Sequence, residues 1–88
     1  PNPLDARIRA AYWQLSKAPG DWVGLAKVRG LLDGAPTADV DDALRRLERE
    51  PDVDIAPETD QRRLSADDRA AAVHIAGQEN HLLKVDRL

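Results

Sequence analysis

Two short apolar stripes at helical spacing, joined by the tight connection GAPT, constrain the fold of this chain more than any other feature. The first stripe is formed by Leu25, Val28, Leu31 and Leu32, and the second by Val40, Ala43, Leu44 and Leu47. Gly34 stands where a helix end favours a residue with positive φ, and Pro51 ends the second helix after Glu50. Thr37 or Asp39 is expected to cap that second helix. The pattern predicts a helix, a short turn and a second helix, each burying one face.

Further elements are predicted on both sides of this helix pair. A helix is expected to begin at Asp5 as its N-cap and to end before Pro19. The short stretch WV at 22–23 predicts a strand just before the pair. After the pair, Val53 and Ile55 alternate with acids, which is typical of a half-buried strand, and the closing run HLLKVD predicts a second strand that pairs with it.

The segment between these last two strands is the least regular part of the pattern. Ser65 and Asp68 form a capping-box spacing that opens the run ADDRAAAVHIA, and Gly77 stands where that run can close. The alanine-rich composition favours a helix over 66–76, with a strand in a hairpin at AVHIA as the alternative. The expected fold is therefore mainly α with a small β-sheet (α+β), in one domain over 1–88. Its order is helix, strand, helix, helix, strand, helix, strand.

The charge of the chain is distributed unevenly around a net value of −3. Residues 1–29 carry five basic and two acidic side chains, residues 30–60 three and ten, and residues 61–88 five and four. A protein that binds nucleic acid without sequence preference usually presents a basic field, which this chain lacks as a whole.

Composition also bounds the class of protein. There is no cysteine, hence no disulfide or thiolate metal site, and no apolar run approaches the roughly 18 residues of a membrane span. A secretory signal is not visible at the start, so a cytoplasmic location without membrane contact is expected. The beginning PNPLD, with no methionine, favours a processed start or a domain excised from a longer protein.

The stretches WVGLAKVRGLL, TADVDDALRRLERE and PDVDIAPE, in this order, resemble the winged helix-turn-helix superfamily of prokaryotes, including MarR-like regulators. The resemblance runs from Asp5 to Asp86. It implies a bacterial transcription-regulation role in which helix 37–50 reads double-stranded DNA and the two later strands form a wing. The chain departs from the superfamily at 57–80, where 24 residues replace a short wing loop.

The helix 37–50 carries most of the candidate DNA-binding residues. Its outward face is predicted to hold Ala38, Asp42, Arg45 and Arg49, with Asp41 and Arg46 toward the flanks. With Thr37 at the start of the helix included, the candidate DNA-binding residues on this helix are Thr37, Asp42, Arg45, Arg46 and Arg49. The resemblance adds Arg62 and Arg63 in the insertion as phosphate contacts. Surface ion pairing, such as Asp42 with Arg46, and solvated loop arginines are the open alternatives.

A protein-interaction or oligomerisation domain that does not bind DNA is the second hypothesis. Trp13 lies on the side of the first helix opposite Ile8, so either another part of the domain covers it or it is an exposed anchor for a protein partner or for self-association.

An enzyme is not expected. His74 and His81 are the only histidines, and neither a zinc-protease spacing nor a phosphate-binding glycine loop is present, so no catalytic residue, metal or cofactor is predicted.

Overall fold

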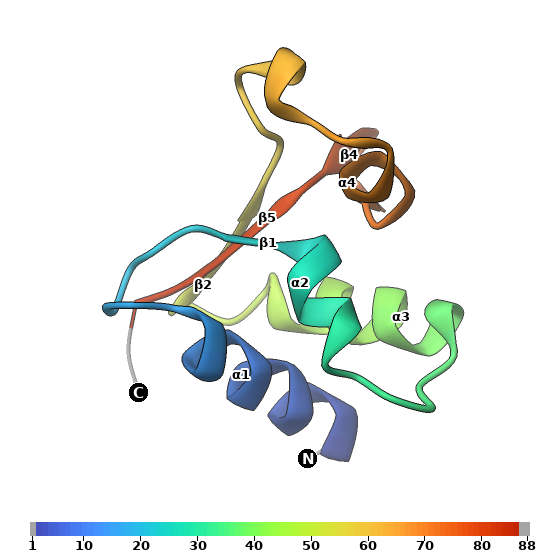
Figure 1. The fold of residues 1–88 in the computed structure, drawn as a ribbon. Coiled ribbons are helices and arrows are strands. Elements are labelled where there is room, and N and C mark those ends of the chain that lie inside the picture. Colours follow the sequence, from blue (N-terminus) through green and yellow to red (C-terminus); the bar gives the residue numbers. More distant parts are fainter. Residues whose placement is uncertain (1, 87–88) are drawn as a thin grey trace.

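The structure, a computed structural model, describes residues 2–86 and is a small α+β domain, as the sequence predicts (Figure 1). None of the helices within this range is long and apolar enough to cross a bilayer. The elements follow the chain in the order α1 (Pro3–Leu15), β1 (Val23–Gly24), α2 (Leu25–Gly30), α3 (Thr37–Leu47), β2 (Val53–Ala56), the 3-10 turn η1 (Gln61–Arg63), α4 (Ala66–Ala70), β3 (Val73–Ile75), β4 (Gln78–Asn80) and β5 (Leu82–Val85).

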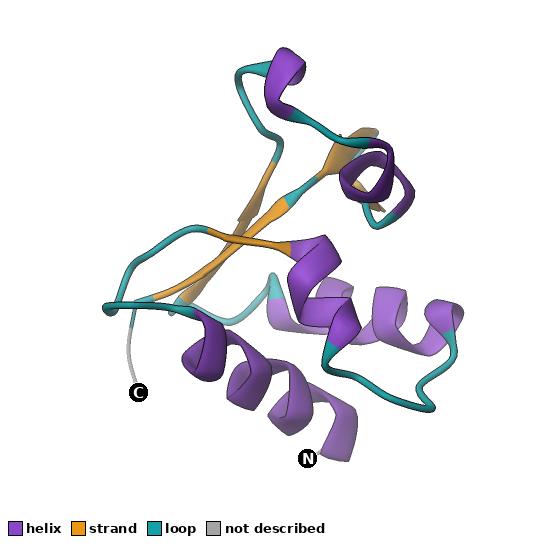
Figure 2. Ribbon diagram, viewed as in Figure 1, coloured by secondary structure: helices purple, strands orange, loops and turns teal. Residues whose placement is uncertain are grey.

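Within residues 2–86, five short strands form two antiparallel sheets. Figure 2 shows the strands in orange. The larger sheet has the order β1-β5-β2, so the last strand of the chain lies at its centre. Val53 pairs with Val85, which confirms the predicted pairing of the strand at 53–56 with the closing run. The smaller sheet is the hairpin β3–β4, which lies within the insertion.

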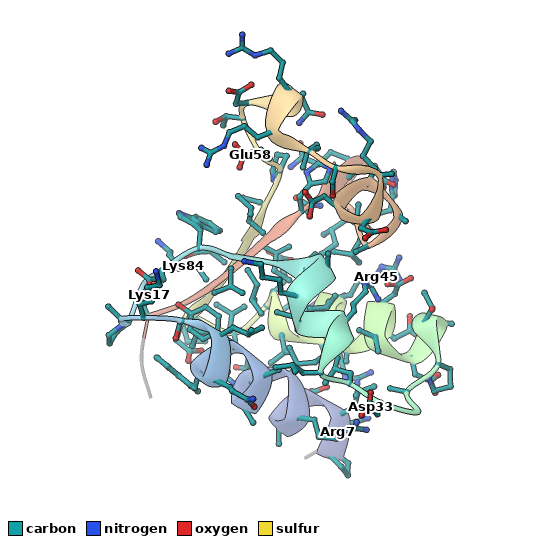
Figure 3. The ribbon with its side chains drawn as sticks, viewed as in Figure 1. Arg7, Lys17, Asp33, Arg45, Glu58 and Lys84 are labelled. Carbon is teal, nitrogen blue, oxygen red and sulfur yellow. The ribbon has the colours of Figure 1, made fainter. Side chains whose placement is uncertain are left out.

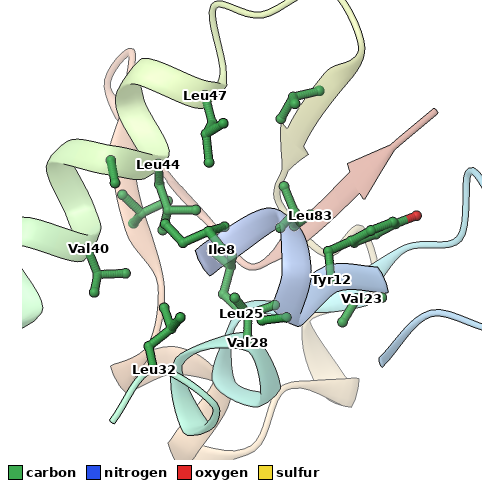
Figure 4. Packing of buried hydrophobic residues seen from close by; sticks show 14 of the residues in the cluster. Ile8, Tyr12, Val23, Leu25, Val28, Leu32, Val40, Leu44, Leu47 and Leu83 are labelled. Carbon is green, nitrogen blue, oxygen red and sulfur yellow. The ribbon is translucent and has the colours of Figure 1, made fainter. Parts of the chain in front are cut away.

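The core lies between the helices and one face of the larger sheet (Figure 4). Side chains alternate along each strand, and the inward positions of the larger sheet bury their apolar groups in one cluster with residues of α1, α2 and α3. The buried cluster includes Ile8, Tyr12, Val23, Leu25, Val28, Leu44, Leu47, Val53, Leu83 and Val85. The Tyr12 hydroxyl donates a hydrogen bond to the Asp21 carbonyl (2.7 Å), so this buried phenol is satisfied and the loop before β1 is attached to α1.

The helix ends differ from the sequence prediction in their capping residues. Asn2, not Asp5, caps α1, and its side chain accepts a hydrogen bond from the Leu4 amide (2.9 Å). Pro3 therefore occupies the first turn, where the missing N–H of proline costs nothing. Asp5 lies in the first turn of the helix, where the positive end of the helix dipole stabilises its carboxylate.

α3 also begins and ends differently from the prediction. Its N-cap is Pro36, and neither Thr37 nor Asp39 makes a side-chain cap. The helix ends at Leu47 instead of Glu50, because the amides of Arg49 and Glu50 donate to the carbonyls of Arg46 and Leu47 in tighter turns. Pro51 disfavours the α conformation at Glu50, the residue directly before it. α2 likewise ends at Gly30, while Gly34 has the expected positive φ (+78°) in the connection.

The insertion contains a hairpin that the preferred interpretation missed. The predicted helix over 66–76 is wrong beyond Ala70. The alternative, a strand in a hairpin, is right for Val73–Ile75, which pair with Gln78–Asn80. Val73 is fully buried in the core cluster while the next residue, His74, is exposed, so burial of a β-branched side chain outweighs the helix propensity of the alanine run. Gly77 lies in the hairpin turn, not at a helix end.

The expected capping box is present at the start of α4, and it makes this turn sensitive to acid. The Asp68 carboxylate accepts a hydrogen bond from the Ser65 amide (3.0 Å), and the Ser65 hydroxyl accepts one from the Asp68 amide (3.0 Å). These hydrogen bonds lower the pKa of Asp68. The bond from the Ser65 amide has the larger effect, and the bond with the Ser65 side chain adds to it.

A carboxyl whose pKa is lowered by folding stabilises the folded state above its unfolded pKa, and this contribution is lost as pH falls through the folded pKa. The wild-type domain should therefore lose a small amount of stability as the pH falls below about 4, where Asp68 becomes protonated. The Asp68→Asn variant has no carboxyl at this position and should not show this loss. Thermal unfolding of both proteins across about pH 3 to 6 measures this difference. Parallel curves for the two proteins would contradict the assignment.

The β3–β4 turn contains an unfavourable residue that can be improved. Ala76 has φ +53° and Gly77 has φ +81°, and positive φ at both central residues is what a type I′ turn requires. A β-carbon is strained in this region, whereas asparagine tolerates it. Ala76→Asn is therefore expected to stabilise the domain by about 0.5–1 kcal/mol, and Gly77→Ala to destabilise it by at least as much. Urea unfolding of the two variants should show shifts of opposite sign.

Candidate interaction surface

The predicted residues Thr37, Asp42, Arg45 and Arg46 lie on α3, whereas the predicted Arg49 lies beyond the end of the helix at Leu47. The central arginine, Arg45, is hydrogen-bonded to other parts of the domain. Thr37, Asp42, Arg45 and Arg49 are all exposed. Arg45 donates from Nη1 to the Asp42 carboxylate (3.1 Å) and from Nε to the carbonyl of His74 in β3 (3.1 Å). Arg45 therefore joins α3 to the hairpin of the insertion, which occupies part of its hydrogen-bonding capacity.

Arg46 contacts α1 instead of its expected partner Asp42. Its guanidinium donates two hydrogen bonds to Asp5, at 2.8 and 3.3 Å. The hydrogen bond with Asp5 is the main reason why the pKa of Arg46 is raised. This ion pair spans 41 positions of sequence and joins α3 to the start of α1.

The two arginines of the insertion lie in η1 and differ in their surroundings. Arg62 donates from Nε (3.0 Å) and Nη2 (3.3 Å) to Asp60, and this side-chain contact lowers the pKa of Asp60. Arg63 lines a cleft together with Trp22 and Glu58. Figure 1 shows η1 at the top of the view and α3 well below it, so the arginines of these two elements start from separate parts of the backbone.

Trp13 is half-buried, and Trp22 is the exposed tryptophan. The Trp13 ring packs edge-on against Tyr12, with 5.0 Å between ring centroids, and contacts the core cluster. Other parts of the domain therefore cover much of Trp13. Trp22 is 46% exposed and Leu31 39%, and they are the exposed large apolar residues among residues 2–86.

Trp22 belongs to the face of the larger sheet that points away from the helices. Strand alternation places Trp22 opposite the buried Val23. In register, Asp54 pairs with Lys84 and Ala56 with Leu82, and these residues share the outward side. We name the surface formed by Trp22, Asp54, Ala56, Leu82 and Lys84 the outer sheet face.

Lys84 supports the exposed ring on this surface. Its Nζ lies 5.1 Å from the centroid of the Trp22 ring, within the range of a cation–π contact. The same ammonium lies 3.6 Å from Asp54 and 3.8 Å from Asp86. The Trp22 ring is therefore held against the sheet while nearly half of its surface stays accessible.

Two clefts flank Trp22. The larger, of about 430 Å³, has a volume within the range of ligand sites and is lined by Trp22, Ala56, Pro57, Glu58, Thr59, Arg63 and Leu82. The smaller, of about 200 Å³, is lined by Leu15, Ser16, Lys17, Asp21, Trp22, Val23, Gly24 and Lys27. A side chain bound in either cleft would contact the tryptophan.

The histidines and nearby acids take structural roles. The His74 Nδ1 lies 2.8 Å from a Glu79 carboxylate oxygen on the exposed hairpin. His81 is buried, and its Nδ1 accepts a hydrogen bond from the Glu58 amide (3.1 Å), which attaches the start of the insertion to β5. Asp86 lies beside Lys84, so Glu79, His81 and Asp86 do not form one site. The described residues contain no cluster of three or more metal-ligating side chains.

The sequence interpretation selected Trp13 and passed over Trp22. Both tryptophans belong to amphipathic segments, and the useful signal was the strand period, since a tryptophan directly before an inward valine must face outward.

Comparisons of this chain with protein-family models, with curated proteins and with solved structures give no match.

Proposed function

We propose that this chain is a winged-helix domain that binds a protein partner through the outer sheet face. The winged-helix assignment is supported by α2 and α3 with their short connection, followed by antiparallel β2 and β5, with β1 on the other edge of β5. The residues between β2 and β5 then replace the loop of the wing.

The observation that carries the interaction function is Trp22. Half-exposed tryptophans set between clefts are typical anchors of protein interfaces, because one side chain offers a large contact area at little cost in conformational entropy. The ring is already held by Lys84, so little ordering remains when a partner binds.

DNA binding through α3 is the second candidate. It is favoured by the exposure of Thr37 and Arg49, since Arg49 has no ion pair among residues 2–86. Against it, Arg45 and Arg46 are paired with carboxylates. Asp39 lies in the first turn of α3, the end that would enter the major groove, and Asp42 lies in the middle of the helix. Fewer unpaired cations near phosphates mean fewer released counterions and weaker binding.

Selection from a displayed library of random peptides tests the interaction function without knowledge of the partner. The immobilised domain is expected to enrich peptides that are lost on the Trp22→Ala variant and retained on Leu31→Ala. Leu31 is a matched control because it is the other exposed large apolar side chain of the described chain. Failure to enrich any peptide, or equal enrichment on Trp22→Ala, would overturn the proposal.

A titration with mixed-sequence duplex DNA at low salt separates the two candidates. The interaction function predicts that the domain binds DNA with a Kd above about 100 μM, which is the weak limit for proteins that bind DNA without sequence preference. Tighter binding that is reduced by Arg45→Gln and Arg49→Gln, and unchanged by Trp22→Ala, would favour the DNA function instead.

A further inference from the structure

We propose that the partner adds an extended segment to the free edge of β1, where its backbone pairs with Trp22 and Gly24 and one apolar side chain packs against the Trp22 ring. This inference rests on the proposed interaction function and specifies how the partner binds. Strand addition of this kind draws its affinity from main-chain hydrogen bonds and its specificity from alternate side chains.

β1 is an edge strand, and the backbone groups on its outer side are identified by the pairing with β5. No strand among residues 2–86 pairs with β1 on the side away from β5. The Leu25 amide donates a hydrogen bond to the His81 carbonyl (2.9 Å), at the end of the β1–β5 pairing. Successive residues of a strand direct their N–H and C=O groups to opposite edges, so Val23 points toward β5 like Leu25, whereas Trp22 and Gly24 point away from it.

The backbone groups on this edge are free to bond. Within residues 2–86 the Trp22 amide, the Trp22 carbonyl and the Gly24 amide have no hydrogen-bond partner. The Gly24 carbonyl belongs to the N-cap of α2, so it accepts the first bond of that helix. A peptide strand presents alternating C=O and N–H groups with complementary partial charges, and it can satisfy the free groups of both residues at once.

The smaller cleft leaves room for an added strand beside β1. Trp22, Val23 and Gly24 line it in succession, together with Leu15 at the end of α1 and Lys27 of α2. A Cβ added to Gly24 would meet no atom within 4 Å, and Figure 1 shows β1 in front of β5 with no element drawn in front of it. The volume of about 200 Å³ is below the range of small-molecule sites, which favours a chain that lies along the open edge over a compact ligand.

The exposed tryptophan selects one side chain of the added strand. Residues directly opposite each other on paired strands place their side chains on the same face of the sheet. The partner residue opposite Trp22 therefore lies on the outer sheet face, against a ring that Lys84 holds in place. An aromatic or β-branched side chain fits this position, because such pairs with an aromatic ring are favourable.

The charges near this edge do not select the partner. Lys17, Lys27 and Asp21 line the smaller cleft, so it carries both signs. Figure 3 shows Lys17 and Lys84 near the loop that leads into β1, and Lys84 lies beside the carboxylate of Asp54. The recognition that we infer therefore rests on backbone hydrogen bonds and one apolar contact, with no requirement on the net charge of the segment.

The variants Gly24→Pro and Gly24→Ala form a matched pair that tests the free edge. Gly24 has φ −66°, which is the value that proline adopts, and its amide has no partner within residues 2–86. Gly24→Pro should therefore keep or slightly raise the thermal stability of the domain, while its ring occupies the place of an added strand. The most enriched Trp22-dependent peptide of the selection is synthesised and titrated into the whole chain. It should bind Gly24→Pro about tenfold more weakly and Gly24→Ala within about twofold of the wild-type affinity.

Backbone methylation of the same peptide gives a second readout that does not depend on the fold of a variant. Every second N–H of an added strand points toward β1. N-methylation at these positions should weaken binding about tenfold, and at the intervening positions by less than about twofold. In the complex, the amide hydrogens of Trp22 and Gly24 should exchange with solvent more slowly than in the free domain.

The outcomes separate this inference from the function beneath it. A Trp22-dependent peptide that binds Gly24→Pro and Gly24→Ala equally well, or that shows no alternation on N-methylation, would overturn strand addition while leaving the interaction function standing. The absence of any Trp22-dependent peptide removes both. Self-association of the chain that is abolished by Gly24→Pro would assign the edge to a second copy of this chain and would also overturn the inference.

Discussion

Leu83→Ala is expected to lower the free energy of unfolding by about 3 kcal/mol, within the range of about 2–5 kcal/mol found for buried leucines. Leu83 lies on the central strand β5 and is almost fully buried. Its neighbours across the strands are Val23 on one side and Ile55 on the other. Truncating it leaves a cavity between the sheet and the helices that the short strands cannot close.

The adjacent Leu82 provides the matched control for this prediction. It lies on the same strand but on the outer sheet face, and it is only partly buried. Leu82→Ala should cost about 1 kcal/mol or less and should instead weaken partner binding, because it removes a wall of the larger cleft. Urea unfolding measures both variants, and equal losses of stability would contradict the assigned orientation of β5.

Arg29→Ala is expected to lower the free energy of unfolding by about 2–3 kcal/mol. The Arg29 side chain is 17% exposed and pairs with Asp41 of α3, which is 25% exposed. Its Nε also donates a hydrogen bond to the carbonyl of Ala71 (2.8 Å), the residue that follows α4. One side chain therefore connects α2, α3 and the insertion, and its loss leaves both a carboxylate and a carbonyl with fewer partners.

A double variant separates the ion pair from the packing around it. Arg29→Met with Asp41→Leu replaces both charges by apolar groups and should recover most of the stability lost in Arg29→Ala. Recovery is favoured because Nη1 of Arg29 is buried and has no hydrogen-bond partner among residues 2–86. If Arg29→Ala costs less than about 0.5 kcal/mol, the insertion is not held by this residue.

The parts of the fold that follow from local patterns were predictable. Stripes such as Leu25 with Val28 and Leu44 with Leu47 identify helices and their buried faces, and alternation at Val53 and Ile55 identifies a strand. The first stripe was wrong at its end, because Leu31 and Leu32 lie beyond α2 and Leu31 is exposed. The boundaries were less accurate, since a helix end depends on which of several competing caps forms.

The hairpin and the ion pairs depend on distant residues and could not be derived in the same way. The run AAAVHIAG favours a helix locally, and it becomes a strand because Val73 is buried in a core formed by other elements. Arg46 meets Asp5 across 41 positions, so this ion pair has no local signature in the sequence. The partial burial of Trp13 depends on the same tertiary packing, whereas the exposure of Trp22 could be predicted from its place beside the inward Val23.

Mapping of the binding surface by nuclear magnetic resonance tests the central claim most directly. The isotope-labelled domain is titrated with the selected peptide and, separately, with duplex DNA. The peptide is expected to shift the indole N–H of Trp22 and the amides of Gly24, Ala56 and Leu82, which surround the larger cleft or lie beside it on the sheet. DNA at the same concentration is expected to shift few resonances. Peptide shifts centred on Thr37, Arg45 and Arg49, with Trp22 unchanged, would contradict the assignment of the outer sheet face as the binding surface.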